Sequence, residues 1–506
     1  MKIFATALSA LLLIGTFPNT EIPHKAKQRL FVSNYENVLG TSLEFKITSE
    51  TEAQAEKAEM AALAEIERLS AVFSAYDANS EFSHWMKQDL NRPVKVSAEL
   101  FDMLSLFERW KTKSNGALDA SAAVAGKLWN DAAKKQQVPT TREINEAVAT
   151  MGKIHYQLDS ANGTATRLSN APLVMNTFAK SYIINLAADA AMAASDVSAI
   201  VVNIGGDLVV KGNVKDPVNV TNPLANAEND APLAHLLIEN KAVATSGNYR
   251  RGANIAGKWY SHIVDPRTGK PVEGVISASV VAPNATDAGA LATAFNVLNL
   301  TESKALAATI TDAEYLIITK DGKRVESEGW SKLIAPNSVL PVVEHHTIPN
   351  YGAEKPWDAK HELVIDFELK RIEGNSHRPF AAIWVENENK VAVRNLALWY
   401  NKTKWVPDLR NWYRINGDKF KENKDNYASV TGATRNPGKY TIKWDGKDDK
   451  GAYVPQGKYT IIIESSKEHG TDEIIRQPME LKKALKKVTN AGNVEISNVT
   501  FDFRKK

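Results

Sequence analysis

The chain has 506 residues, more than one ordinary domain holds, so we expect two or three domains. Hydrophobic residues make up 43% of the sequence, which is enough to build sizeable cores. The 62 basic and 59 acidic residues leave a net charge of +3, without a basic run that aromatic residues interleave. This balance gives no support for nucleic-acid binding. The absence of cysteine excludes a disulfide framework and a cysteine-linked lipid anchor.

The N-terminus has the layout of a secretory signal. Lys2 precedes an apolar run over 3–14, which glycine and proline then end. This run is too short to span a bilayer as a helix. A buried first helix is the alternative, but a run at the extreme terminus favours a signal peptide over 1–20. Export without cysteine indicates a bacterial periplasm, and no later stretch is apolar enough for a stable membrane span.

Residues 28–335 mix helical and strand periodicities, which predicts an α+β domain. Thr51 is a candidate cap for the first helix, and a hairpin over 313–327 turns at an Asp-Gly pair. We expect helices over 51–74, 97–116, 141–152, 176–195 and 289–299, and buried strands over 199–206 and 276–283.

The sequence changes character over 336–360, where four prolines and a lack of periodicity predict a linker. Beyond it, alternating apolar residues and Gly/Pro turns predict a small β-sandwich over 361–506, with one short helix near 407–417. We expect its strands over 362–370, 379–387, 390–400, 439–446, 458–465 and 494–503.

Two glycine-containing stretches of the first domain are candidate ligand sites. In "NIGGDLVVKG" (203–212) a strand enters paired glycines, which let a ligand or a second backbone approach closely. In "VATSGNYRRG" (243–252) the hydroxyls and a glycine backbone can donate to an anion, with Arg250 and Arg251 nearby. A tight β-turn and a hydrophilic hairpin loop are the alternatives for these two stretches.

Two further stretches carry polar groups suited to phosphate and metal. "YSHIVDPRTGKPV" (260–272) packs His262, Asp265, Arg267 and Thr268 into a loop that two prolines stiffen, which suits a phosphate or pyrophosphate. "NATDAGALATAFNVL" (284–298) offers hard oxygen ligands for Mg²⁺ at a strand-to-helix junction. A surface turn and a packed alanine-rich helix are the respective alternatives.

The order of these four stretches resembles the ApbE family, the FAD-dependent FMN transferases. Four earlier segments agree: "ENVLGTSLEFKI" (36–47), "LSAVFSAYDANSEFS" (69–83), "NGALDASAAVAGKLW" (115–129) and "FAKSYIINLAADA" (178–190). The likeness covers roughly 30–335 and implies an ApbE-like, T-fold-like α+β domain.

The resemblance implies an Mg²⁺-dependent enzyme that cleaves FAD, releases AMP and passes FMN to a threonine of an exported acceptor protein. By position, the metal ligands are Ala179 (through its carbonyl), Thr293 and, by a different backbone path, Asp287. His262 and Asp265 are the candidates for orienting the pyrophosphate or accepting the hydroxyl proton. The flavin-site positions are Leu39, Asp119, Lys180, Gly205, Gly206, Asp207, Thr245, Ser246, Gly247 and His262.

The sequence departs from the family pattern at four positions. Gly289 stands where the family helix carries a metal-binding Asp, Ser181 replaces a glycine, Asn185 an aspartate and Leu39 a methionine. A missing anionic ligand weakens Mg²⁺ binding. The alternative function is therefore a non-transferring FAD-binding or flavin carrier protein. Hydrolysis of FAD to FMN and AMP at the same site is a third possibility.

The second domain contains a candidate modification site. Acceptors of these transferases carry a short S/T-G-A-T motif, and "TGAT" ends at Thr434 between polar turn formers. We expect an openly displayed hydroxyl, and Thr434 is a possible FMN acceptor; a tight turn is the alternative. The region resembles an uncharacterised β-rich domain found after ApbE-like domains. Its stretch 444–464 also resembles Ig-like modules of flagellar hook-capping proteins.

Overall fold

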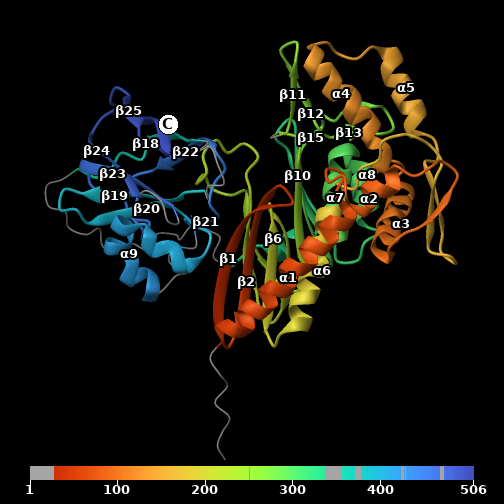
Figure 1. Ribbon diagram of the computed structural model, residues 1–506. Coiled ribbons are helices and arrows are strands. Elements are labelled where there is room, and N and C mark those ends of the chain that lie inside the picture. Colours follow the sequence, from red (N-terminus) through yellow and green to blue (C-terminus); the bar gives the residue numbers. More distant parts are fainter. Residues whose placement is uncertain are drawn as a thin grey trace, which may run out of the picture.

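The computed structural model describes residues 28–249, 251–336, 355–370, 378–422, 427, 429–467 and 472–506. They form an N-terminal α+β unit and a C-terminal β-sandwich that lie side by side, with β1 facing the sandwich (Figure 1). The predicted signal peptide and residues 337–354 of the predicted linker lie outside the described residues. No described helix has the length and apolar character needed to cross a membrane.

One eight-stranded antiparallel sheet organises the N-terminal unit. Its strand order is β1-β2-β6-β7-β10-β15-β16-β17. The strands are β1 Arg29–Val38, β2 Thr41–Ser49, β6 Ala199–Ile204, β7 Asp207–Gly212, β10 Ala242–Gly247, β15 Val275–Ala282, β16 Glu314–Thr319 and β17 Arg324–Glu326. The predicted strands and the 313–327 hairpin are confirmed.

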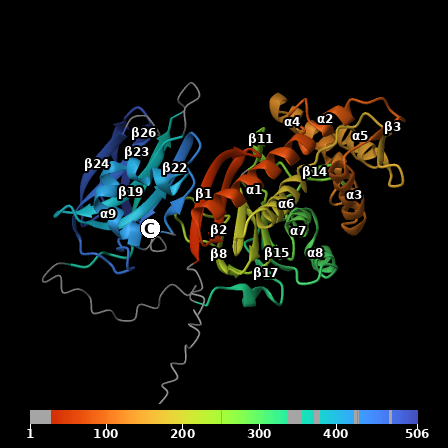
Figure 2. The same cartoon turned by 60° about the horizontal axis from the view of Figure 1, so that its bottom comes forward.

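Helices cover one face of this sheet because alternate strand residues point toward it. In β2, Leu43, Phe45 and Ile47 are buried in the main core against α1 Glu52–Phe73, α6 Ala179–Ala194 and α7 Ala285–Val297. Figure 2 shows α1, α6 and α7 along this face. Thr51 caps α1 through a capping box with Gln54, as predicted.

The opposite face of the sheet is covered by a hairpin, β8 Asp216–Val220 and β9 Ala234–Ile238, and by a 3₁₀ turn, η2 Trp330–Leu333. Trp330 is fully buried in this second core. An ion pair of 2.9 Å joins Lys46 of β2 to Asp216 and fixes the hairpin on the sheet.

The remaining elements of this unit lie to the right of the sheet and above it in Figure 1. There Trp129, Ile144, Ile255 and Val264 share a small core. The elements are α2 Glu81–Met86, β3 Pro93–Lys95, α3 Ala98–Lys113, η1 Ala120–Ala122, α4 Ala123–Lys135, α5 Thr141–Met151, β4 Tyr156–Asp159, β5 Thr164–Arg167, β11 Gly252–Ile255, β12 Lys258–Ser261, β13 Val264–Asp265, β14 Lys270–Pro271 and α8 Leu300–Ala307.

The C-terminal unit is a sandwich of a four-stranded sheet, β22-β18-β26-β25, and a five-stranded sheet, β21-β20-β19-β23-β24. One core lies between the sheets, and α9 and η3 cover the outer face of the larger sheet. The elements are β18 His361–Leu369, β19 Phe380–Asn387, β20 Ala392–Trp399, η3 Thr403–Asp408, α9 Arg410–Glu422, β21 Thr431–Gly432, β22 Gly438–Trp444, β23 Gly457–Ser466, β24 Asp472–Leu481, β25 Val488–Gly492 and β26 Ile496–Lys505.

Helix α7, helix α9 and strand β24 are among the elements that differ from the sequence prediction. Helix α7 begins at Ala285 rather than 289, because the Asn284 side chain accepts a hydrogen bond from the backbone N–H of Asp287 at 2.9 Å. Helix α9 begins at Arg410, after the turn that contains Pro407, and reaches Glu422. Strand β24 was not predicted; it is an edge strand, where its proline at 478 is tolerated.

Polar contacts join the two units. Near β1, the Asn34 N–H donates to the Asn401 carbonyl at 2.7 Å. In the loop between β8 and β9, the Asn229 side chain pairs with both backbone groups of Lys443, at 2.9 and 2.7 Å. Four ion pairs cross the same interface: Arg378–Glu36, Lys402–Glu59, Arg435–Glu228 and Lys443–Asp230.

A buried carboxylate holds the helix of the sandwich in place. Glu464 of β23 is 0% exposed and accepts hydrogen bonds from the Asn411 N–H, the Asn411 Nδ2 and the Trp412 N–H, at 2.8, 2.9 and 2.8 Å. These backbone groups belong to the first turn of α9, where N–H groups lack partners within the helix.

Glu464→Ala is expected to lower the free energy of unfolding by about 2–4 kcal/mol, because it leaves buried donors unsatisfied. Urea unfolding followed by tryptophan fluorescence measures the change. Glu388→Ala is the matched control, since that side chain is 63% exposed. Equal stability of the two variants would contradict the capping role.

Candidate functional site

Two tight turns lie next to each other at one end of the main sheet. Leu39–Gly40 joins β1 to β2 and Gly205–Gly206 joins β6 to β7, and all four residues have positive φ, from 50° to 94°. A Cβ on Gly205 would stand 2.8 Å from the side chain of Thr41, so glycine is needed for this close approach. Leu39 adopts its left-handed backbone at 37% exposure.

The carboxylate of Asp207 connects three of the predicted segments. Asp207 begins β7 and is 8% exposed. Its Oδ2 pairs with Nζ of Lys180 from α6 at 2.7 Å, and its Oδ1 accepts from the Thr245 N–H of β10 at 3.1 Å. The structure therefore brings together Lys180, Asp207 and Thr245, which are up to 65 positions apart in the sequence.

Helix α7 is tied to the same end of β10. Asn296 is 2% exposed, and its Nδ2 donates to the carbonyls of Ser246 at 3.1 Å and Ala292 at 2.9 Å. Its Oδ1 is buried without a hydrogen-bond partner among the described residues. Asn296 was missed by sequence reasoning, since an asparagine in an alanine-rich helix carries no motif. Gly247 lies under the ring of Tyr249, where a Cβ would meet the ring at 2.6 Å.

The loop 260–272 is fixed by its own charges. Arg267 binds the Asp265 carboxylate through Nε and Nη2, both at 3.0 Å, and reaches Glu302 of α8 at 3.2 Å. The indole N–H of Trp129 donates to the Gly269 carbonyl at 2.8 Å. Asp265 is 9% exposed and its carboxylate is occupied by Arg267. Its position fits orientation of the loop better than proton transfer.

His262 is more exposed to solvent than Asp265, the other candidate catalytic residue. Its ring is exposed, and Nδ1 lies 3.1 Å from the Arg251 carbonyl. Crowding by protein atoms and the Arg251 charge lower the pKa of His262, while solvent access at the ring screens this effect. The imidazole is therefore neutral at pH 7 and can accept a proton. Within the described part of the chain, the structure places no direct contact between His262 and Asp265 side chains. Arg250 lies outside that part.

Asp119 occupies a different part of the site region. Its carboxylate pairs with Lys111 at 2.6 Å and accepts from the N–H and Oγ of Ser121. The preceding loop borders 260–272, since a Cβ on Gly116 would lie 3.5 Å from Arg267. The structure therefore assigns Asp119 to shaping this loop, and it is not joined to Lys180 or Asp207.

The predicted metal ligands fall into two groups. Ala179 begins α6, and Thr293 lies on α7, which packs against α6. Asp287 precedes Thr293 by six residues, which places the two side chains about 120° apart around the helix. The Asp287 carboxylate instead accepts from Asn284 Nδ2 at 2.8 Å. Gly289, one turn before Thr293, shares its face of the helix. No cluster of three His, Cys, Asp or Glu suited to a metal occurs in the described ranges.

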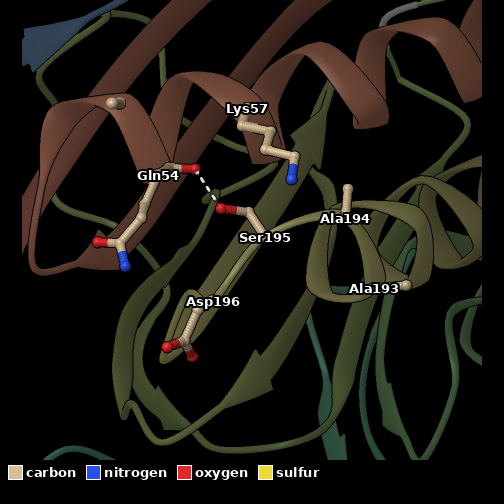
Figure 3. Close-up of a pocket in the computed structure, with 7 residues that line it drawn as sticks. Gln54, Lys57, Ala193, Ala194, Ser195 and Asp196 are labelled. Atoms are coloured by element: carbon tan, nitrogen blue, oxygen red, sulfur yellow. Dashed lines mark hydrogen bonds between the residues drawn. The ribbon is translucent and has the colours of Figure 1, made fainter.

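A shallow pocket at the other end of α6 contains none of these residues. It is lined by Gln54, Lys57 and Asp196 among others, and Ser195 Oγ donates to the Gln54 carbonyl at 2.9 Å (Figure 3). Because Lys180 is at the start of α6 and Ser195 follows its end, the pocket is separate from the candidate site.

The expectation that the Thr434 hydroxyl is openly displayed is wrong. Thr434 is 3% exposed, and its Oγ1 has no hydrogen-bond partner among the described residues. The preceding residues Thr431–Gly432 form β21, parallel to β20. The next residue, Arg435, lies over the Trp399 ring at 4.7 Å and pairs with Glu228 of the first unit at 3.2 Å. Thr434 is therefore covered at the edge of the interface between the units.

We expect His262 to titrate below its ordinary range and Arg251→Ala to raise its pKa, because one cation beside the imidazolium is removed. NMR titration of the imidazole resonances measures both. Since folding disfavours the charged imidazole, stability decreases as the pH falls below 6.5 through the folded pKa. Lys270→Ala is the control from the same loop; an equal shift with it would contradict the specific effect of Arg251.

Comparison with known proteins finds two families along the chain. The model of the ApbE family matches residues 39–317, and a family described as predicted periplasmic protein (DUF2271) matches 362–498. The FAD:protein FMN transferase of Klebsiella pneumoniae is 26% identical over 306 residues, covering 59% of this chain and 85% of that protein. The transferase of the same name from Haemophilus influenzae is 27% identical over 322 residues, covering 61% and 92%.

Solved structures show the same fold for the first unit. The crystal structure of the ApbE protein from Thermotoga maritima is 25% identical and superposes with a TM-score of 0.54, covering 61% of this chain and 100% of that one. The flavin transferase ApbE from Vibrio cholerae is 22% identical, with a TM-score of 0.52 and the same coverage. Because the family model spans more than half of its residues, the chain belongs to the ApbE family.

Proposed function

We propose that this chain is an FAD:protein FMN transferase, which moves FMN from FAD to a threonine hydroxyl of an exported acceptor protein. The observation that carries the proposal is the Asp207 junction, which joins Lys180 of α6 to Thr245 of β10 beside the Gly205–Gly206 turn. Membership of the family, whose relatives bear this name, supports the same activity.

The proposed reaction is a phosphoryl transfer. The acceptor threonine oxygen bonds to the phosphorus of the FMN half, the pyrophosphate P–O bond breaks, and AMP leaves with the bond's electron pair. Neutral His262 is positioned by the loop to take the hydroxyl proton, and Asp265 holds that loop through Arg267. Lys180 and the backbone N–H groups around Ser246 and Gly247 are the donors that we assign to the phosphates and flavin.

Magnesium fits the same junction as a cation shared with FAD. The Ala179 carbonyl and the Thr293 hydroxyl are hard, neutral oxygen donors on the packed helices α6 and α7. Mg²⁺ is commonly held by few protein ligands together with substrate phosphates. When bound, it would neutralise charge on the pyrophosphate.

The setting that we propose is the bacterial periplasm. The apolar run over 3–14 and the match of 362–498 to a predicted periplasmic family support it. The partner is an exported protein with an S/T-G-A-T loop. The docked sandwich adds a second surface close to the transferase unit (Figure 1).

Thr293→Ala is expected to lower flavin transfer by at least about tenfold, because it removes a proposed metal ligand. The assay combines the chain, FAD, Mg²⁺ and a separate domain bearing an S-G-A-T loop, and reads the intact mass of both proteins. Exposed Thr301 on α8 gives the matched control, Thr301→Ala. Full activity in EDTA would contradict the metal-dependent reaction.

A flavin carrier that does not transfer FMN is the second candidate. Gly289 favours it, because position 289 shares the helix face of Thr293 and provides no carboxylate for a metal. The same assay separates the two functions. Bound FAD with flavin on neither protein would support the carrier, and AMP release without any mass gain would indicate FAD hydrolysis.

We also propose Thr434 as an FMN acceptor that is reached only when its loop leaves the interface, since the residue is 3% exposed. Glu228→Ala, which removes the ion pair to Arg435, is expected to increase a mass gain of one FMN on the chain. Thr434→Ala should abolish this gain, whereas Thr431→Ala, in the same loop, should retain it. A mass gain that survives Thr434→Ala would exclude this site.

A further inference from the structure

Ser181 of α6 fills the space beside Gly289 of α7. A Cβ built on Gly289 would stand 2.2 Å from Ser181 Oγ and 3.1 Å from Ser181 Cβ, and the Thr177 carbonyl oxygen is 3.9 Å away. Real Cβ atoms do not approach other heavy atoms at 2.2 Å. A side chain at 289 is therefore incompatible with Ser181 in its present position. The Ser181 side chain therefore fits against α7 only because position 289 is a glycine.

The Ser181 hydroxyl makes no hydrogen bond within the described part of the chain. Ser181 is 2% exposed as a residue, but its Oγ is not among the fully buried side-chain atoms that lack a partner, so this oxygen keeps some access. Ser114 and Ser121 of the same unit bond to protein groups, whereas the Oγ of Ser303 is fully buried without a partner in the described residues. The Ser181 oxygen is thus available to a ligand at the junction of the two helices.

The hydroxyl lies beside both proposed metal ligands. Ser181 follows Ala179 by two residues in the first turn of α6. Gly289, which Ser181 faces, precedes Thr293 by one turn on the same side of α7. The Ser181 hydroxyl and the Thr177 carbonyl therefore lie next to Gly289, one helical turn from Thr293 on α7, and all three oxygens are uncharged.

We propose that Ser181 is a cation-binding residue of this chain, whose hydroxyl stands where a side chain at position 289 would otherwise lie. The inference rests on the proposed function, because it concerns the same Mg²⁺ site. Neutral oxygens alone hold Mg²⁺ weakly, since affinity rises with the number of charged ligands. The chain consequently takes up Mg²⁺ only together with the FAD pyrophosphate, which supplies the negative charge.

The test compares the wild type with Gly289→Asp, Ser181→Gly and the double variant Ser181→Gly/Gly289→Asp. Isothermal titration with Mg²⁺, with and without FAD, measures affinity, and circular dichroism measures Tm. In the wild type, we expect Mg²⁺ binding only with FAD present. The double variant should bind Mg²⁺ without FAD, at least about tenfold more tightly than the wild type. Gly289→Asp alone should lower Tm, and adding Ser181→Gly should restore it.

Two results would overturn the inference. If Gly289→Asp alone matches the double variant in Tm and Mg²⁺ affinity, Ser181 does not occupy the space that a side chain at position 289 needs. If the double variant is stable but gains no Mg²⁺ affinity, the space is not at a cation site. These readouts do not require flavin transfer. A wild type that binds Mg²⁺ with FAD but transfers no FMN would refute the proposed function and leave this inference standing.

Ser181→Ala keeps the inference testable if the double variant does not fold. It preserves the packing but removes the oxygen, so we expect Mg²⁺ affinity in the presence of FAD to fall by about tenfold with Tm unchanged. Ser303→Ala is the matched control, because Ser303 is also a helical serine, 1% exposed, whose Oγ lacks a partner in the described part of the chain. An Mg²⁺ affinity of Ser181→Ala equal to that of Ser303→Ala would exclude Ser181 as a ligand.

Discussion

The candidate site depends on one partly buried ion pair, between Asp207 and Lys180. Asp207 starts a strand of the sheet and Lys180 lies in the first turn of the helix that covers it, so the 2.7 Å contact fixes the helix against the end of the sheet. The second carboxylate oxygen accepts from the Thr245 N–H and aligns the next strand. Removing Lys180 would leave the mostly buried Asp207 carboxylate uncompensated, which costs more than losing a surface pair.

Local periodicity explains why most elements could be predicted from the sequence. The capping box at Thr51, the alternation in β2 and the Asp-Gly hairpin are signals within a few residues of one another. The order of four short motifs was enough to indicate the family. Element boundaries were less certain, as the early start of α7 at its Asn284 cap shows.

The side-chain pairing inside the site could not be predicted, because it depends on contacts between distant segments. Asp265 looked like a catalytic candidate, but its carboxylate is occupied by Arg267, two residues away. Thr434 looked exposed because its neighbours are small and polar, yet the Arg435–Glu228 pair and the loop between β8 and β9 bring the first unit against it. The sequence shows that the residues around Thr434 are small and polar, but the burial of Thr434 depends on tertiary contacts that the sequence does not show.

The charges around Thr293 are the reason that our proposal links cation binding to FAD binding. The Asp207 carboxylate is compensated by Lys180, and the Asp287 carboxylate is held by Asn284 on another face of α7. Neither therefore offers a free negative charge to a cation near Thr293. The oxygens of Ser181 and Thr177 beside Gly289 are neutral. A divalent cation that binds only neutral oxygens loses more hydration free energy than it gains from these ligands. The negative charge of the FAD pyrophosphate would supply the missing binding energy. In the proposed site, the substrate therefore supplies the negative charge that metal binding requires.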